Sequence, residues 1–206
     1  MSLTDPAPVR IESLPTKVMG PASYGWWGMV WLIATEAMMF AALIASYFYV
    51  RYRAQIEWPP DGIEAPSLPL IVMMSVVLWS SSIPMHLADH GIRSGHRRRC
   101  LAGLAATFIL GAAFLVLQVA VEYPETLRHF TPRTNAYGSL FYTITGLHGL
   151  HVLVGLALIV WTAVRTWAGH FDQERHLTIR NVAMYWHFVD VVWIAVFLSL
   201  YLSPHV

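Results

Sequence analysis

Five apolar stretches, each about as long as a bilayer-spanning helix, dominate this 206-residue chain. The hydrocarbon core of a bilayer is about 30 Å thick, and a helix needs about 20 mostly apolar residues to cross it. None of the stretches alternates between polar and apolar residues, as a membrane β-strand would. The sequence therefore predicts an all-α fold, an integral membrane bundle of five transmembrane helices. The predicted spans are Trp26–Val50, Leu68–Ala88, Leu101–Val121, Ser139–Val164 and Val182–Leu202.

The composition agrees with a membrane protein and excludes several other classes. Charged residues make up 12% of the chain, about half of the ~25% that is usual in soluble domains. Aromatic residues make up 13%, which excludes a disordered chain. The net charge of +1 argues against a nucleic-acid partner, because such binding needs a basic surface. A single cysteine, Cys100, allows neither an internal disulfide nor a cysteine-based metal centre.

The chain divides into two parts by polarity. Residues 1–24 form a polar N-terminal segment, and residues 25–206 form one five-span transmembrane domain. The N-terminal segment lacks a charged start, an apolar centre and a small-residue cleavage site, so no signal peptide is expected.

Lysine and arginine predict the orientation, because they gather on the cytoplasmic side of a membrane. The side that holds the N-terminus carries nine of them and the opposite side carries four. We therefore expect a cytoplasmic N-terminus and an outside C-terminus. The run Arg97, Arg98 and Arg99 is the predicted membrane-surface anchor, placed to contact anionic headgroups. The nine are Arg10, Lys17, Arg93, Arg97, Arg98, Arg99, Arg165, Arg175 and Arg180, and the four are Arg51, Arg53, Arg128 and Arg133.

Polar side chains inside the predicted spans are the candidates for function. A charge at the centre of a transmembrane helix costs at least ~2.5 kcal/mol and usually faces a partner or a cavity. The predicted buried polar network consists of Glu36, His148, His151, His187 and Asp190. Gln118 and Glu122, four residues apart, are expected to form a polar pair at the outer end of the third span.

Spacing and depth suggest which members of the network meet. His148 and His151 are three residues apart, as are His187 and Asp190, so each pair shares a helix face. A rise of about 1.5 Å per residue places Glu36 at the depth of His148. The same rise places His151 at the depth of Asp190. Pairing a carboxylate with an imidazole lowers the cost of burying both.

Spacing alone leaves three interpretations of these residues open. Histidines three or four apart can bind haem or another metal. Intramembrane Glu, His and Asp can relay protons. They can also form a satisfied polar network that fixes helix packing. No Gly-x-Ser-x-Gly elbow and no P-loop occurs, so nucleophilic and nucleotide chemistry find no support.

Two motifs resemble the subunit III family of the haem–copper oxidases. The segment from Thr145 to Val152, with Gly155, is similar to the family's signature in the fourth of these spans, and the segment from Tyr185 to Trp193 to its last-span signature. Further similarity lies around Glu36, at Gln118 with Glu122 and Tyr123, and from Gly138 to Tyr142. The resemblance runs from about Trp26 to Leu202 and favours the five-helix bacterial form, with its Glu36 favouring a cytochrome c oxidase.

The resemblance implies an accessory role in a proton-pumping enzyme that reduces dioxygen to water. Such a subunit binds no cofactor itself and holds no metal, since haem a and copper lie in partner subunits. It supports proton uptake, stability and lipid binding beside subunit I of an aa3-type cytochrome c oxidase. Expected partners are oxidase subunits I and II and membrane phospholipid, with a larger respiratory supercomplex left open. The expected location is the bacterial plasma (inner) membrane.

Other functions remain open at this point. Subunit III of a quinol oxidase, or an accessory protein of a nitric oxide reductase, would share the same motifs. From another class, a stand-alone membrane haem or metal enzyme would use His148, His151 and His187. A proton-linked transporter would be expected to show inverted repeats, and the sequence shows no such repeat.

Overall fold

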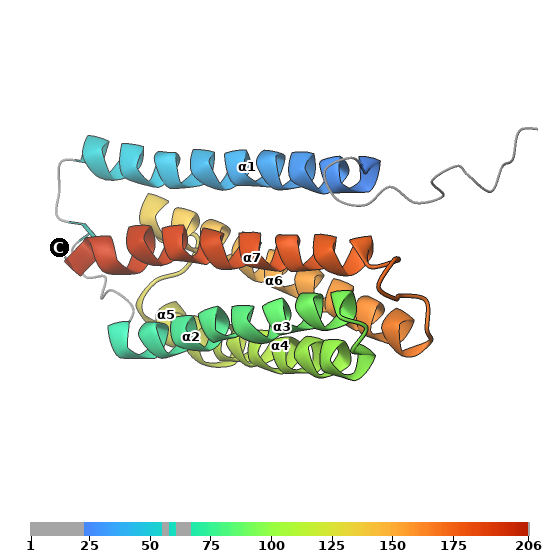
Figure 1. The fold of residues 1–206 in the computed structure, drawn as a ribbon. Helices are drawn as coiled ribbons and strands as arrows, with labels where there is room; N and C mark the ends of the chain where they lie inside the picture. Colours follow the sequence, from blue (N-terminus) through green and yellow to red (C-terminus); the bar gives the residue numbers. More distant parts are fainter. Residues whose placement is uncertain (1–22, 55–57, 61–66, 206) are drawn as a thin grey trace, which may run out of the picture.

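The computed structural model describes residues 23–54, 58–60 and 67–205, and every regular element within these ranges is helical. Figure 1 shows the helices side by side, nearly parallel to one axis. The α-helices are α1 (Tyr24–Ala54), α2 (Leu68–Ser80), α3 (Ser82–Arg93), α4 (Arg97–Leu117), α5 (Tyr123–His129), α6 (Ala136–Trp167) and α7 (Leu177–Val196). Two π-helical segments, η3 (Gln118–Glu122) and η4 (Phe197–Leu202), and a short 3₁₀ turn, η5 (Ser203–His205), complete the list.

Five helical stretches in the described ranges are long and apolar enough to cross a membrane. The predicted all-α fold with five spanning helices is therefore confirmed. The orientation of the bundle stays a prediction. Two of the charges on which it rests, Arg10 and Lys17, lie outside the described residues, as does most of the predicted N-terminal segment. The stretches are Tyr24–Arg53, Leu68–Arg93, Arg97–His129, Ala136–Trp167 and Leu177–Leu202.

The second span is broken at Ser81, between α2 and α3. Pro84 has no backbone N–H, so the carbonyl of Ser80 loses its helical partner and the helix is interrupted one turn before the proline. Thr107 on α4 donates to the carbonyl of Ser81 over 3.4 Å. A Cβ at Gly103 would lie 2.5 Å from the carbonyl oxygen of Pro84, so only glycine lets α4 approach α3 this closely.

Two indole rings of α7 form the centre of the core. Trp186 and Trp193 are both fully buried. The Nε1–H of Trp186 donates to Ser81 Oγ over 2.8 Å, and that of Trp193 donates to Ser75 Oγ over 2.9 Å. Buried indoles need such a partner. These bonds tie the last helix to the second span on both sides of its break.

Helix α1 stands at the edge of the bundle, where it contacts α6 and α7 (Figure 1). Few of its side chains are buried, chiefly Phe40 and Tyr47. The start of α1, the α3–α4 turn and the α6–α7 connection lie at one end, while α5 and the C-terminus lie at the other.

Candidate functional site

The first polar pair joins α1 to α6. His151 Nε2 lies 3.1 Å from Glu36 Oε2. The other ring nitrogen, Nδ1, lies 2.7 Å from the carbonyl oxygen of Leu147, one turn earlier on α6. A carbonyl can only accept, so Nδ1 carries a proton and donates it. One further proton then occupies the contact between Nε2 and Oε2, bound to either the imidazole or the carboxyl.

This pair borders a small crevice between α1 and α6. The crevice has a volume of about 280 Å³ and an almost entirely apolar lining. The ring of Phe40 packs against His151 with centroids 5.1 Å apart, and Tyr185 donates to the His151 carbonyl oxygen over 3.3 Å. The side chains of His151 and Glu36 remain 13% and 33% exposed. The contact between His151 and Glu36 therefore borders the apolar crevice and is not sealed inside the protein.

The pairing differs from the one predicted from depth. The sequence placed Glu36 level with His148, yet the partner of Glu36 is His151, about one turn further along α6. The sequence also placed His151 level with Asp190, but Asp190 bonds to Ser82 instead. The estimates assumed untilted helices with known ends. An error of a few residues at either end is enough to move a partner by one turn.

The second polar group joins α3 to α7 through a serine. Ser82 Oγ donates to Asp190 Oδ2. The same oxygen lies 3.0 Å from His187 Nδ1, and having given its own proton to Asp190 it can only accept there. The result is a directed chain from imidazole N–H through hydroxyl to carboxyl. His187 and Asp190 share a face as predicted, and the hydroxyl group of Ser82 connects them.

His148 stands apart from both groups. It is completely buried, and its ring lies 4.8 Å from that of Trp193 and 5.8 Å from that of Phe114, measured between centroids. Among the described residues neither of its nitrogens has a hydrogen-bond partner. His148 therefore packs as part of the aromatic core, one turn away from the residue that contacts Glu36.

Gln118 and Glu122 are buried rather than placed at a helix end. Each is 1% exposed, because the helix continues through η3 and α5 to His129. Gln118 Nε2 donates to the Thr145 carbonyl oxygen over 3.3 Å, and Glu122 Oε1 accepts from the hydroxyl of Tyr201 on η4. The prediction of a helix-end polar pair at the interface is therefore wrong. Pro124 and the charges after it resemble a span's end in sequence, although the helix runs on for another two turns.

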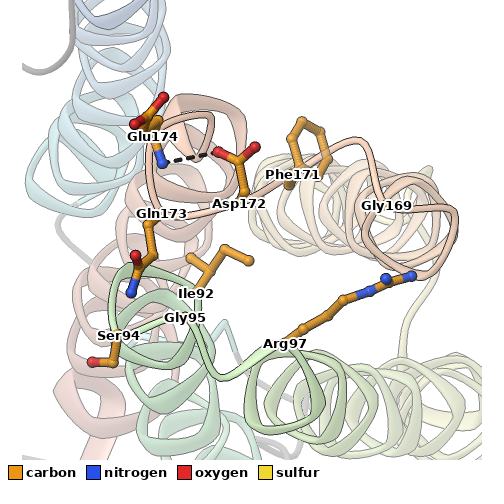
Figure 2. Close-up of a pocket in the computed structure, with 9 residues that line it drawn as sticks. All are labelled: Ile92, Ser94, Gly95, Arg97, Gly169, Phe171, Asp172, Gln173 and Glu174. Atoms are coloured by element: carbon orange, nitrogen blue, oxygen red, sulfur yellow. Dashed lines mark hydrogen bonds between the residues drawn. The ribbon is translucent and has the colours of Figure 1, made fainter.

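The predicted membrane anchor begins α4. Arg97, Arg98 and Arg99 are all exposed there. Figure 2 shows Arg97 extending from α4 toward Gly169, which follows α6, across a pocket of about 800 Å³. The opposite wall is the α6–α7 connection, in which Asp172 Oδ1 accepts from the backbone N–H of Glu174 over 2.9 Å (Figure 2). The arginines thus lie at a polar end of the bundle, and their role as a membrane-surface anchor stays a prediction.

The comparisons with known proteins identify the family. Residues 22–204 match the model of the family described as "Cytochrome c oxidase subunit III". The chain is 38% identical to cytochrome c oxidase subunit 3 of Lumbricus terrestris over 181 residues, which is 85% of this chain and 68% of the relative. The chain belongs to the cytochrome c oxidase subunit III family. The subunits 3 of Pisaster ochraceus and Arabidopsis thaliana are 37% and 34% identical and are covered to 68% and 67%, each against 85% of this chain.

Membership defines the molecular context of the polar groups. Cytochrome c oxidase subunit III is part of the cytochrome c oxidase complex, so this chain is a multi-pass membrane protein of the respiratory chain. Within the described ranges, no three His, Cys, Asp or Glu side chains gather in a way that could hold a metal ion. The imidazoles of His151 and His187 are instead engaged by a carboxyl and by a hydroxyl.

Two site residues of this subunit III were not singled out from the sequence. Ser82 connects His187 to Asp190, and its only signal was a run of hydroxyls in the second span. Tyr201 binds Glu122, and nothing in its sequence context distinguished it from an interfacial aromatic residue. Both lie opposite a carboxyl on another helix, a relation that a single sequence does not show.

Proposed function

We propose that this subunit III supports the redox subunits of an aa3-type cytochrome c oxidase without a redox centre of its own. Its proposed roles are to support proton uptake into subunit I and to stabilise the complex. The observation that carries the proposal is the pairing of ionisable side chains inside two helix interfaces, Glu36 with His151 and Asp190 with Ser82 and His187.

Both groups have the chemistry of proton handling. The contact of His151 with Glu36 holds one proton between a base and a carboxyl, which can shift between them without a change in total charge. The Ser82 hydroxyl can pass a proton toward Asp190 while it accepts one from His187 Nδ1, as the imidazole takes up a replacement proton at Nε2. Ionisable residues at such depth are costly and commonly mark proton relays. These contacts also link α1 to α6 and α3 to α7, so one set of residues supports both roles.

The test compares retention of the subunit with turnover. In the purified oxidase, His151→Ala and Asp190→Ala are expected to lower the amount of subunit III that remains bound through detergent washing. They are expected to slow proton uptake, followed with a pH indicator, more than the first turnover of dioxygen. His170→Ala, in the exposed α6–α7 connection, is the matched control. Loss of the first turnover in either variant would indicate a direct catalytic role and contradict the proposal.

Phospholipid binding is a further part of the proposal. An apolar groove of about 370 Å³ lies between α4 and α6, lined by residues that include Leu104, Phe108, Ile159 and Val160. Its wholly apolar lining suits an acyl chain. Native mass spectrometry of the complex is expected to show phospholipid that dissociates together with this subunit. Widening the groove with Phe108→Ala should reduce that lipid, and an unchanged lipid count would contradict this assignment.

The complex and its location are proposed from the resemblance. The partners are oxidase subunits I and II, which carry haem a and copper, with cytochrome c as electron donor and the bacterial plasma membrane as the site. Purification through a tag on this chain is expected to yield these subunits with haem and copper. The separated chain should show no Soret band. A Soret band in the separated chain would favour the stand-alone haem enzyme instead.

A further inference from the structure

Four buried polar atoms between α4, η3 and α6 have no hydrogen-bond partner among the described residues. They are Oε1 of Gln118, Oε2 of Glu122 and both ring nitrogens of His148. The three side chains are 1%, 1% and 0% exposed, so the surroundings of the bundle do not reach them. A buried polar group without a hydrogen bond is costly, and most such groups in folded proteins have a partner. These atoms therefore need a partner that the described side chains do not supply.

Gln118 and His148 meet at one turn of α6. Gln118 Nε2 donates to the carbonyl oxygen of Thr145 over 3.3 Å, and a Cβ at Gly149 would lie 3.0 Å from Gln118 Oε1. The amide of Gln118 therefore lies against the turn that carries His148. The ring of His148 contacts that of Phe114, one turn before Gln118 on α4, with centroids 5.8 Å apart. The unpartnered oxygen and the unpartnered nitrogens thus belong to adjoining turns of two packed helices.

Glu122 belongs to the same group of buried polar residues. It follows Gln118 by four residues, at the other end of η3, and its Oε1 accepts from the hydroxyl of Tyr201. The ring of Tyr201 contacts that of Trp193 with centroids 5.8 Å apart, and Trp193 contacts His148 at 4.8 Å. The second oxygen of Glu122 and the nitrogens of His148 therefore border one aromatic cluster.

The turn of α6 beside these residues carries little side-chain volume. Gly146 and Gly149 stand on either side of Leu147 and His148 in the chain. Outside its own helix backbone and chain neighbours, a Cβ at Gly146 would meet one atom within 4 Å, the hydroxyl oxygen of Tyr123 at 3.7 Å. A buried water needs about the volume of one water molecule and two to four polar partners. A small ligand of this kind suits the turn better than a larger one.

We propose that ordered water lies between His148, Gln118 and Glu122 and joins them into a third polar group of this subunit, the His148 water site. Water is selected because the unpartnered atoms include both donors and acceptors. A neutral imidazole has one N–H and one bare nitrogen, whereas Gln118 Oε1 can only accept. A cation has no use for the N–H, and the carboxyl of Glu122 disfavours an anion. The inference is independent of the proton role proposed above, which uses neither His148 nor Glu122.

A density map of the intact oxidase, at a resolution that shows ordered water, tests the site directly. We expect a density peak about 2.7–3.2 Å from a ring nitrogen of His148, within hydrogen-bond distance, and a chain of such contacts that reaches Gln118 Oε1. A map that shows water elsewhere in the subunit interior but none beside His148 would overturn the proposal.

Replacement of His148 gives opposite results with and without the water. Phenylalanine suits the aromatic neighbours Phe114 and Trp193. If His148 had no partner, His148→Phe would remove a costly buried polar group and unfolding of the full chain in detergent would become less favourable. If water bridges it, the variant displaces the water, and the unfolding equilibrium constant should rise about tenfold, equivalent to about 1.4 kcal/mol. His170→Phe, in the exposed connection, is the control. A constant at or below the unsubstituted level would overturn the proposal.

A second substitution separates loss of the water from poor packing of the new ring. Gln118→Met removes the other partner of the water with little change in shape. Loss of both partners of a hydrogen bond can be nearly neutral, so the double variant His148→Phe with Gln118→Met should regain most of the stability that His148→Phe loses. Poor packing would instead give losses that add. Additive losses would overturn the proposal, because they would show that the two residues share no ligand.

Discussion

The packing around Trp186 depends on the size of single residues. The buried ring is held between two glycines, Gly111 on α4 and Gly155 on α6. A Cβ at Gly111 would lie 2.5 Å from Trp186 Cη2, and one at Gly155 would lie 2.8 Å from Trp186 Cε3. The ring is also fixed by its bond to Ser81, so it has little freedom to move away. Helices α4, α6 and α7 therefore pack around the ring of Trp186, and the two glycines allow this close approach.

Gly111→Ala is therefore expected to destabilise the subunit. Overpacking of a well-packed core costs about 1–3 kcal/mol, and the free energy of unfolding in detergent should fall by that amount. Gly28→Ala is the matched control, because nothing lies within 4 Å of a Cβ at Gly28 on α1. Gly28→Ala should be neutral or slightly stabilising, as alanine favours a helix. Equal effects of the two substitutions would show that Trp186 is less constrained than its contacts indicate.

The Glu36–His151 contact can be measured by a double-mutant cycle. Removal of one partner leaves the other polar group without its bond, so the effects of Glu36→Ala and His151→Ala should not add. Contacting residues in one network typically show a coupling of about 0.5–3 kcal/mol, and we expect a value in this range for the free energy of unfolding. The pair Glu36→Ala and His170→Ala, whose members lie on α1 and in the α6–α7 connection, should be additive. Additivity in both pairs would contradict the contact.

At the scale of elements, the two π-helical segments face each other. Glu122 ends η3 and Tyr201 lies in η4, and the tyrosine hydroxyl donates to the carboxyl. Both side chains are fully or almost fully buried. A π-helical turn admits one extra residue and rotates the side chains that follow it. Each segment therefore aims its polar residue into the helix interface, where the two bond.

Tyr201→Phe tests this link. The variant keeps the ring and removes the hydroxyl, so Glu122 is left buried without its donor. An unsatisfied buried acceptor costs about 1–3 kcal/mol, which should appear as a lower free energy of unfolding. Tyr52→Phe is the control, since Tyr52 is exposed near the end of α1. If Tyr201→Phe were as mild as Tyr52→Phe, the bond between the segments would contribute little.

The elements themselves were well predicted, whereas their contacts were not. Runs of apolar residues located all five spanning helices, because crossing a bilayer fixes both length and composition. Polar residues inside those runs included the carboxyls and imidazoles of both polar groups. The partner of Glu36 was missed by one turn, and the burial of Glu122 was missed altogether. Tilt, rotation and helical continuation past Pro124 depend on packing between helices, which no single run of sequence contains.

At the scale of the whole molecule, positive charge separates the two ends of the bundle. Arg97, Arg165 and Arg175 belong to the end that holds the start of α1, whereas Arg128 and Arg133 belong to the end with α5 (Figure 1). Lysine and arginine are retained on the cytoplasmic side during insertion. The asymmetry therefore predicts that the α6–α7 connection faces the cytoplasm and the α5–α6 connection faces outside.

Cysteine labelling in intact cells tests the orientation. Cys100 is buried, and Cys100→Ser gives a background free of cysteine to which one exposed cysteine is added. Gln173→Cys lies in the α6–α7 connection and Arg133→Cys in the α5–α6 connection, and both native side chains are exposed. A membrane-impermeant maleimide should label the Arg133→Cys variant in intact cells and the Gln173→Cys variant only after permeabilisation. The reverse pattern would place the N-terminus outside. It would also place the predicted surface anchor, Arg97 to Arg99, on the outside, because α4 belongs to the same bundle.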